Sequence, residues 1–123
     1  MEQKLLALTE ELLQKTYHIK STFEEVKKAN QERDFYQEVK PFADDVKGKL
    51  DQWEPLAIEW LKNNPVKYLH PQQITHTAEN LDMISIQCFF PKTSLTRFRH
   101  YAESVEYVLK NLLNAIQKKA SSI

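Results

Sequence analysis

The chain has 123 residues, and its 17 basic side chains balance 17 acidic ones, so it carries no overall charge that would attract it to nucleic acid or anionic lipid. Its single glycine is too few for a nucleotide-binding glycine loop, and its single cysteine excludes an intramolecular disulfide and a multi-cysteine metal site. The sequence contains neither a recognisable signal peptide nor a membrane-spanning segment, so we expect one cytoplasmic domain over residues 1–123.

The first predicted helix covers about Gln3–Ala29, because apolar residues recur there at spacings of three and four. Asn30 is predicted to end it. Thr9 and Thr16 lie at the edge of the apolar stripe, where we expect each hydroxyl to bond to a carbonyl of the preceding turn. The residues expected to face inward are Leu5, Leu8, Leu12, Ile19, Phe23 and Val26.

The second predicted helix, about Asp34–Asn63, keeps its apolar stripe through two prolines. Pro41, Gly48 and Pro55 stand seven residues apart and therefore share the opposite, solvent-facing side. Prolines on that side should bend the helix around the core. We favour one bent helix over three short ones, because separate segments need not keep the stripe in phase. Its inward residues should be Phe35, Val39, Phe42, Val46, Leu50, Trp53, Ala57 and Trp60.

Residues 64–70 are predicted to connect the second helix to a third, about Pro71–Phe89, because proline suits the first position of a helix. This connector contains Val66, Tyr68 and Leu69, which we expect to lie across the end of the bundle. The third helix should face inward with Ile74, Thr77, Ala78, Leu81, Ile84, Ser85 and Cys88.

A fourth helix is predicted from Leu95 onward, with Thr93 or Ser94 as its cap and fraying residues 118–123 after it. Four helices joined by short connectors favour an all-α, antiparallel up-down-up-down four-helix bundle with a bent second helix. The apolar stripe of this last helix comprises Leu95, Phe98, Ala102, Val105, Leu109, Leu112 and Ile116.

No arrangement of reactive residues indicates catalysis. None of the four histidines stands three residues after a glutamate or four residues from another histidine, so the spacings of diiron and helical zinc sites are missing. Cys88 lies on an inward stripe, where burial should raise the pKa of its thiol and make it a poor nucleophile. We therefore expect no metal and no cofactor, and we favour a binding protein over an enzyme.

The surface that we consider first for function is a narrow apolar strip on the third helix. Met83, Ile86 and Phe90 fall on its far side at spacings of three and four, next to Lys92. We interpret this strip as a face for a protein partner or a weak homodimer. The alternative is that the connector covers the end of the helix, or that the helix tilts, which would bury part of both faces.

Two other groups of residues are candidates for binding. Trp60, Tyr68 and His70 could line a pocket between the second helix and the connector, which would suit a small-molecule binder or a minor enzyme. Arg97 and Arg99 lie in a stretch without acidic residues, from position 83 through 102, and could contact an anion. We do not expect nucleic-acid binding, because so few charges give little affinity.

Two stretches of sequence support a family resemblance. Residues 36–44 have the sequence YQEVKPFAD, and residues 89–98 have the sequence FFPKTSLTRF. With these stretches, the chain resembles, over its full length, the YppE-like family of small uncharacterised proteins from Bacillus-type bacteria. The resemblance implies a cytoplasmic four-helix bundle and supplies no catalytic motif.

Overall fold

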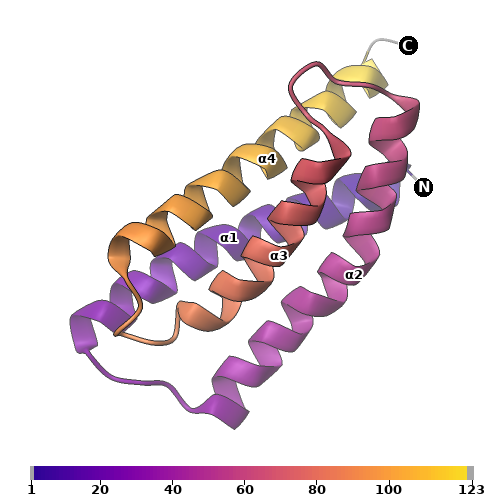
Figure 1. Cartoon of the computed structure of the whole chain (residues 1–123). Helices are drawn as coiled ribbons and strands as arrows, with labels where there is room; N and C mark the ends of the chain where they lie inside the picture. Colours follow the sequence, from indigo (N-terminus) through magenta and orange to yellow (C-terminus); the bar gives the residue numbers. More distant parts are fainter. Residues whose placement is uncertain (1, 122–123) are drawn as a thin grey trace.

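The computed structural model describes residues 2–121, which form a bundle of four long helices (Figure 1). Consecutive helices run antiparallel and pack against each other, and α1 also packs against α4. Among the described residues the fold is all-α, so the predicted up-down-up-down bundle is confirmed. The helices are α1 (Glu2–Ala29), α2 (Lys40–Asn63), α3 (Pro71–Gln87) and α4 (Leu95–Ser121), and a short π-helix, η1 (Phe35–Val39), leads directly into α2.

The helix ends follow local signals in the sequence. Asn30 adopts a left-handed conformation with φ of 51°, and its N–H donates to the carbonyl of Val26 at 2.8 Å, so it ends α1 as predicted. Pro71 is the first residue of α3, also as predicted. Ser94 caps α4, because its Oγ accepts a hydrogen bond from the N–H of Arg97 at 3.3 Å.

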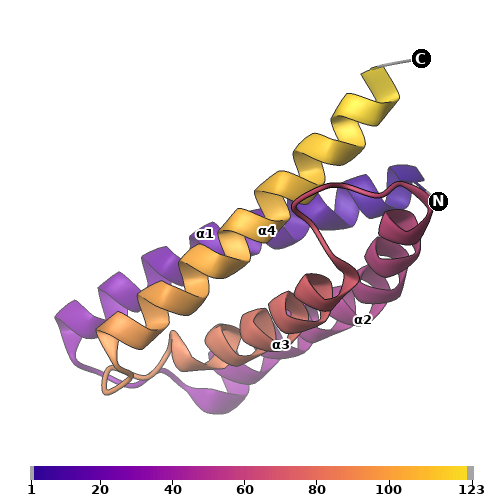
Figure 2. The ribbon, with the colours of Figure 1, turned by 45° about the horizontal axis from the view of Figure 1, so that its top comes forward.

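The chain is continuously helical from Phe35 through Asn63, and its axis bends in Figure 2. The side chain of Asp34 caps the first turn by accepting from the N–H of Gln37 at 2.8 Å. The N–H of Lys40 then bonds back to the carbonyl of Phe35, five residues earlier, which widens this turn to a π-helix. The wide turn precedes Pro41, whose ring would clash with the carbonyl four residues before it in a regular α-helix.

The outer side of this long helix carries its helix-breaking residues. Pro41, Gly48 and Pro55 are all exposed to solvent, as the spacing of seven predicted. Pro55 lies inside α2 without interrupting it. The opposite side stays dry, because Val46, Leu50, Trp53 and Ala57 are buried in the core, and the prediction of one bent helix is confirmed.

Trp53 occupies the centre of the core and links α2 to α1. Its side chain is fully buried, and its indole Nε1 donates a hydrogen bond to the hydroxyl of Thr9 at 3.0 Å. The Thr9 hydroxyl in turn donates to the carbonyl of Leu5 at 2.7 Å, and Thr16 makes the equivalent bond to Leu12 at 2.8 Å. Both back-bonds were predicted, whereas the bond from Trp53 was not.

Two residues of the predicted stripes do not face the core. The side chain of Phe35 is 49% exposed, and that of Leu95 is 42% exposed. Each lies in the first turn of its helix, where the chain has only begun to pack against its neighbours. The prediction of an inward position was therefore wrong for both, because periodicity does not show where a partner helix ends.

Two predicted helix ends also need correction. α3 stops at Gln87 rather than at Phe89, and the hydroxyl of Thr93 donates to the carbonyl of Gln87 at 3.0 Å. α4 remains helical through residues 118–121, which we expected to fray, and its last turns extend beyond the other helices (Figure 2). Residues 122–123 lie outside the described part of the chain.

Replacing Thr9 with valine should leave the buried indole N–H of Trp53 without an acceptor. We expect Thr9→Val to lower the free energy of unfolding by about 1–3 kcal/mol. Thr16→Val is the matched control, because Thr16 is equally buried but bonds only to its own helix, and it should cost roughly 0–1 kcal/mol. Urea unfolding measures both, and equal losses would show that the Trp53 hydrogen bond contributes nothing.

Gly48 weakens α2 without any steric need for glycine, since a Cβ there would meet no atom within 4 Å. We expect Gly48→Ala to raise the free energy of unfolding by about 0.5–1 kcal/mol, because alanine favours the helix. Gly48→Ser should give a smaller gain. Thermal unfolding followed by circular dichroism checks the order, and a loss of stability in both variants would contradict it.

Candidate functional site

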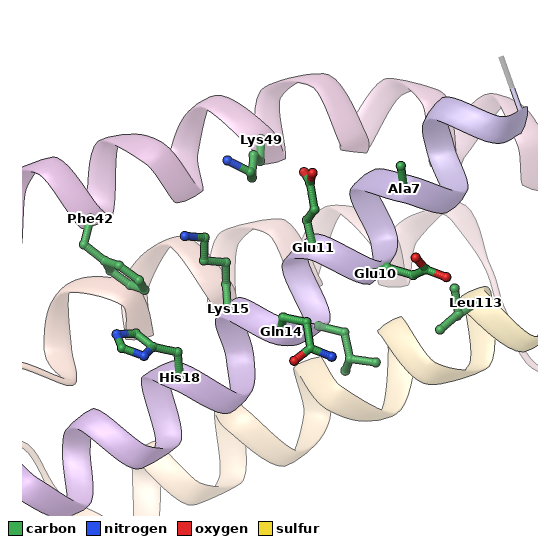
Figure 3. Close-up of a pocket in the computed structure, with 10 residues that line it drawn as sticks. Ala7, Glu10, Glu11, Gln14, Lys15, His18, Phe42, Lys49 and Leu113 are labelled. Atoms are coloured by element: carbon green, nitrogen blue, oxygen red, sulfur yellow. The ribbon is translucent and has the colours of Figure 1, made fainter.

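A groove of about 930 Å³ runs along the outer face of α1, between α2 and α4 (Figure 3). Glu11 points toward α2 and Glu10 toward α4, while the ring of His18 lies beside that of Phe42. The sequence did not indicate this groove, because its lining comes from three separate helices. Its lining comprises Ala7, Glu10, Glu11, Leu13, Gln14, Lys15, His18, Phe42, Lys49 and Leu113.

The basic groups of this groove are already engaged within the protein. Lys15 and Lys49 both contact Asp45, at 3.0 and 2.7 Å, and the hydrogen bonds from Lys49 and then Lys15 lower the pKa of that carboxyl. Lys15 Nζ also lies 5.3 Å from the centre of the Phe42 ring, and the His18 ring lies 5.3 Å from it. The contacts of Lys15 and His18 hold α1 to α2, and Lys49 pairs within α2, so these basic residues are engaged without a ligand.

The predicted apolar strip lies near the end of the bundle that carries the α1–α2 and α3–α4 connections, which we call the loop end (Figure 1). Ile86 is 39% exposed, and Lys92 is also exposed. Met83 is half-buried and packs against the core, and Phe90 is half-buried. The structure thus exposes the middle of the apolar strip, at Ile86, and partly buries Met83 and Phe90 on either side of it.

Other apolar side chains are exposed at the loop end. Phe35 is 49% exposed, Tyr36 77% and Leu95 42%, and the rings of Phe35 and Tyr36 meet edge to face. With Ile86, these make four of the seven large apolar side chains that are exposed within residues 2–121. Such side chains are therefore concentrated at one end instead of being scattered over the molecule.

Three basic residues accompany these apolar groups. Lys92 lies in the α3–α4 connection, and Arg97 and Arg99 lie in the first two turns of α4, all exposed. None of the three takes part in an ion pair with any residue between positions 2 and 121. We define the loop-end surface as the exposed residues Phe35, Tyr36, Ile86, Lys92, Leu95, Arg97 and Arg99, together with the half-buried Phe90.

The opposite end of the bundle, which we call the terminal end, carries a depression of about 510 Å³. Trp60 and Tyr68 both line it, so the structure brings these two predicted pocket residues together. His70 is not among the lining residues, and its backbone N–H instead donates to the side chain of Gln73 at the start of α3, at 2.7 Å. The rest of the lining comprises Asn64, Pro65, Val66, Ala115, Lys118 and Lys119.

A polar cluster beside this depression joins three helices. The indole Nε1 of Trp60 donates to Glu2 Oε2 at 3.0 Å, and Lys119 Nζ lies 3.3 Å from the same oxygen. The hydrogen bonds from Trp60 and then Lys119 lower the pKa of Glu2. A second depression of about 310 Å³ adjoins the cluster and shares Trp60 and Lys119 with the first. Sequence reasoning missed this cluster, because its members are 58 and 117 positions apart and follow no periodic pattern.

Two features that would point to a function are missing from the described part of the chain. Residues 2–121 contain no group of three or more histidine, cysteine, aspartate or glutamate side chains that could bind a metal ion. No helix in the same range combines the length and apolar character needed to cross a membrane.

Comparison with known proteins agrees with the resemblance seen in the sequence. The chain is 26% identical to the uncharacterized protein YppE of Bacillus subtilis (strain 168), over 98% of each chain. The crystal structure of YppE superposes with a TM-score of 0.92 over 98% of both chains. A protein of unknown function from Listeria innocua, 25% identical, also gives 0.92, over 98% of this chain and 96% of that one.

A third structure, from Staphylococcus aureus, is 28% identical and gives a TM-score of 0.83 over 91% of this chain and 95% of that one. It is described as a bacterial domain of unknown function from the DUF1798 family. Residues 9–116 of this chain, which include most of the bundle, match the same family, a bacterial domain of unknown function. The chain therefore belongs to the DUF1798 family.

Proposed function

We propose that this protein is a cytoplasmic, non-enzymatic interaction module that binds a protein partner through the loop-end surface. The observation that carries this proposal is that four of the seven large apolar side chains exposed within residues 2–121 lie at one end of the bundle. Exposed apolar patches rimmed by polar groups are typical of protein-binding sites. Ile86 and Phe90, from the predicted strip, lie within this surface.

The charges of the surface favour a partner with an acidic and apolar face. Lys92, Arg97 and Arg99 are exposed and have no carboxylate partner within the described residues. Positive groups around an apolar patch orient an acidic partner and speed its association.

The position of Cys88 supports a non-enzymatic role. The thiol is fully buried, and its Sγ contacts the carbonyl of Ser85 at 3.6 Å. Burial raises its pKa from 9.0 to about 12, so almost no thiolate forms near neutral pH. The only cysteine of the chain therefore acts as a small apolar side chain of the core.

A second candidate function is the binding of a small molecule at the terminal end. The observation that favours it is the depression of about 510 Å³ that Trp60 and Tyr68 line together. Its size falls in the range of roughly 300–1,000 Å³ that is usual for small-molecule sites. Because the two surfaces lie at opposite ends of the bundle, the two functions do not exclude each other.

The Cys88 thiol should react with a disulfide reagent only after unfolding. In the native protein we expect a low rate from pH 7 to pH 9, because the raised pKa keeps the thiol protonated until about pH 12. In urea the rate should rise as the pH passes the ordinary thiol value of 9.0. Absorbance of the released thiolate reports both rates, and rapid reaction of the folded protein would show that Cys88 is accessible.

Charge at position 86 should weaken partner binding without unfolding the protein. We expect Ile86→Glu to weaken partner binding at least about tenfold, because it places a charge in an apolar contact. Its stability should change little, since Ile86 is already partly exposed, whereas Met83 packs against the core and is a poor site for this test. Tyr107→Glu is the matched control, because Tyr107 is 54% exposed near the middle of α4.

The measurement is quantitative capture from an extract of cells that make the protein, followed by mass spectrometry. A protein that is retained by the native chain and by Tyr107→Glu, but lost with Ile86→Glu, supports the proposal. Equal retention by all three chains would contradict it. Loss of retention after nuclease treatment would also contradict it, since it would indicate nucleic acid bound through Arg97 and Arg99.

A further inference from the structure

We infer that the depression at the terminal end binds an amphiphilic organic anion, with an apolar body against Trp60 and Tyr68 and its charge beside Lys118. This inference rests on the second candidate function, small-molecule binding, and adds the chemistry of the ligand. It is independent of the loop-end surface, because the two sites share no residue.

The lining of the depression suits an apolar body. Tyr68 is 53% exposed, although its neighbour Leu69 is 2% exposed and anchors the connector in the core. A ligand in the depression would cover the accessible surface of Tyr68 together with Pro65, Val66 and Ala115. Burial of aromatic surface is a main source of affinity in small-molecule sites.

The walls are held in place before any ligand binds. Both the backbone N–H and the side-chain Nδ2 of Asn64 donate to the carbonyl of Trp60, at 2.8 and 2.9 Å. The N–H of Leu69 donates to the carbonyl of Val66 at 3.2 Å and closes the connector into a tight turn. A site with fixed walls loses little conformational entropy on binding.

The charges around the depression select an anion. Its lining contains two lysines and no carboxylate. Lys118 is exposed and makes no ion pair with any residue of the 2–121 range. The nearby carboxylate of Glu2 already accepts hydrogen bonds from Trp60 and Lys119, so the charges of Glu2 and Lys119 balance each other. A cation in the depression would find no carboxylate in the lining, whereas an anion would pair with Lys118.

The test compares decanoate with decylamine at pH 7, both below their micelle concentrations. These probes share one apolar chain and carry opposite charges at this pH. Trp60 fluorescence reports binding, because Trp60 lines the depression while Trp53 is fully buried in the core. We expect saturable binding of decanoate that is about tenfold tighter than that of decylamine.

Two variants locate the binding, and both change exposed side chains, so the fold should be retained. Lys118→Glu should weaken decanoate binding about tenfold and favour decylamine. Tyr68→Ala should weaken both probes, because it removes apolar contact area. Lys28→Glu and Tyr107→Ala are the matched controls, since both lie outside the depression, and they should leave binding unchanged.

The possible results distinguish the preference for an anion from the existence of the small-molecule site. Equal affinities for decanoate and decylamine, with no effect of Lys118→Glu, would overturn the inferred preference for an anion and leave small-molecule binding in place. Failure of both probes to reach saturation, or binding that Tyr68→Ala does not alter, would overturn the site itself. None of these results tests the binding of a protein partner to the loop-end surface, which is tested separately with the Ile86→Glu variant.

Discussion

The fold depends on one constraint, which is that the apolar side of α2 must stay in phase along its whole length. Val46, Leu50, Trp53 and Ala57 are buried on that side, while the helix-breaking residues face solvent. The prolines therefore bend α2 and remove hydrogen bonds only where water can replace them. Because the phase is kept, Trp53 can reach Thr9 in the centre of the core, and Trp60 can reach Glu2 at the end of the bundle.

The same constraint separates the two candidate surfaces. A continuous helix from Phe35 to Asn63 spans the bundle, so it contributes exposed aromatic rings to the loop end and Trp60 to the terminal end. The middle of the bundle is stabilised by a dry core and by surface ion pairs such as Lys20 with Glu106, at 2.8 Å. Functional residues are therefore expected near the helix ends, because core packing constrains the side chains there least.

Much of this architecture could be predicted from the sequence, because helical periodicity identifies buried faces directly. The helix ends at Asn30 and Pro71 follow local signals and were correct. The exposure of Phe35 and Leu95 could not be predicted, since it depends on where neighbouring helices stop. Tyr68 was expected near Trp60 because both adjoin the connector, whereas Glu2 and Lys119 meet only through the fold, from opposite ends of the sequence.

Amide hydrogen exchange along α2, read residue by residue, tests this account most directly. If α2 is one helix with a single buried side, residues 57–61, after Pro55, should be protected to a similar degree as residues 46–50, before it. The amides of both segments would then exchange only when the whole bundle unfolds. Exchange of residues 57–61 that is orders of magnitude faster would mean that α2 breaks at Pro55, and that Trp60 and the terminal end form a separate, less stable unit.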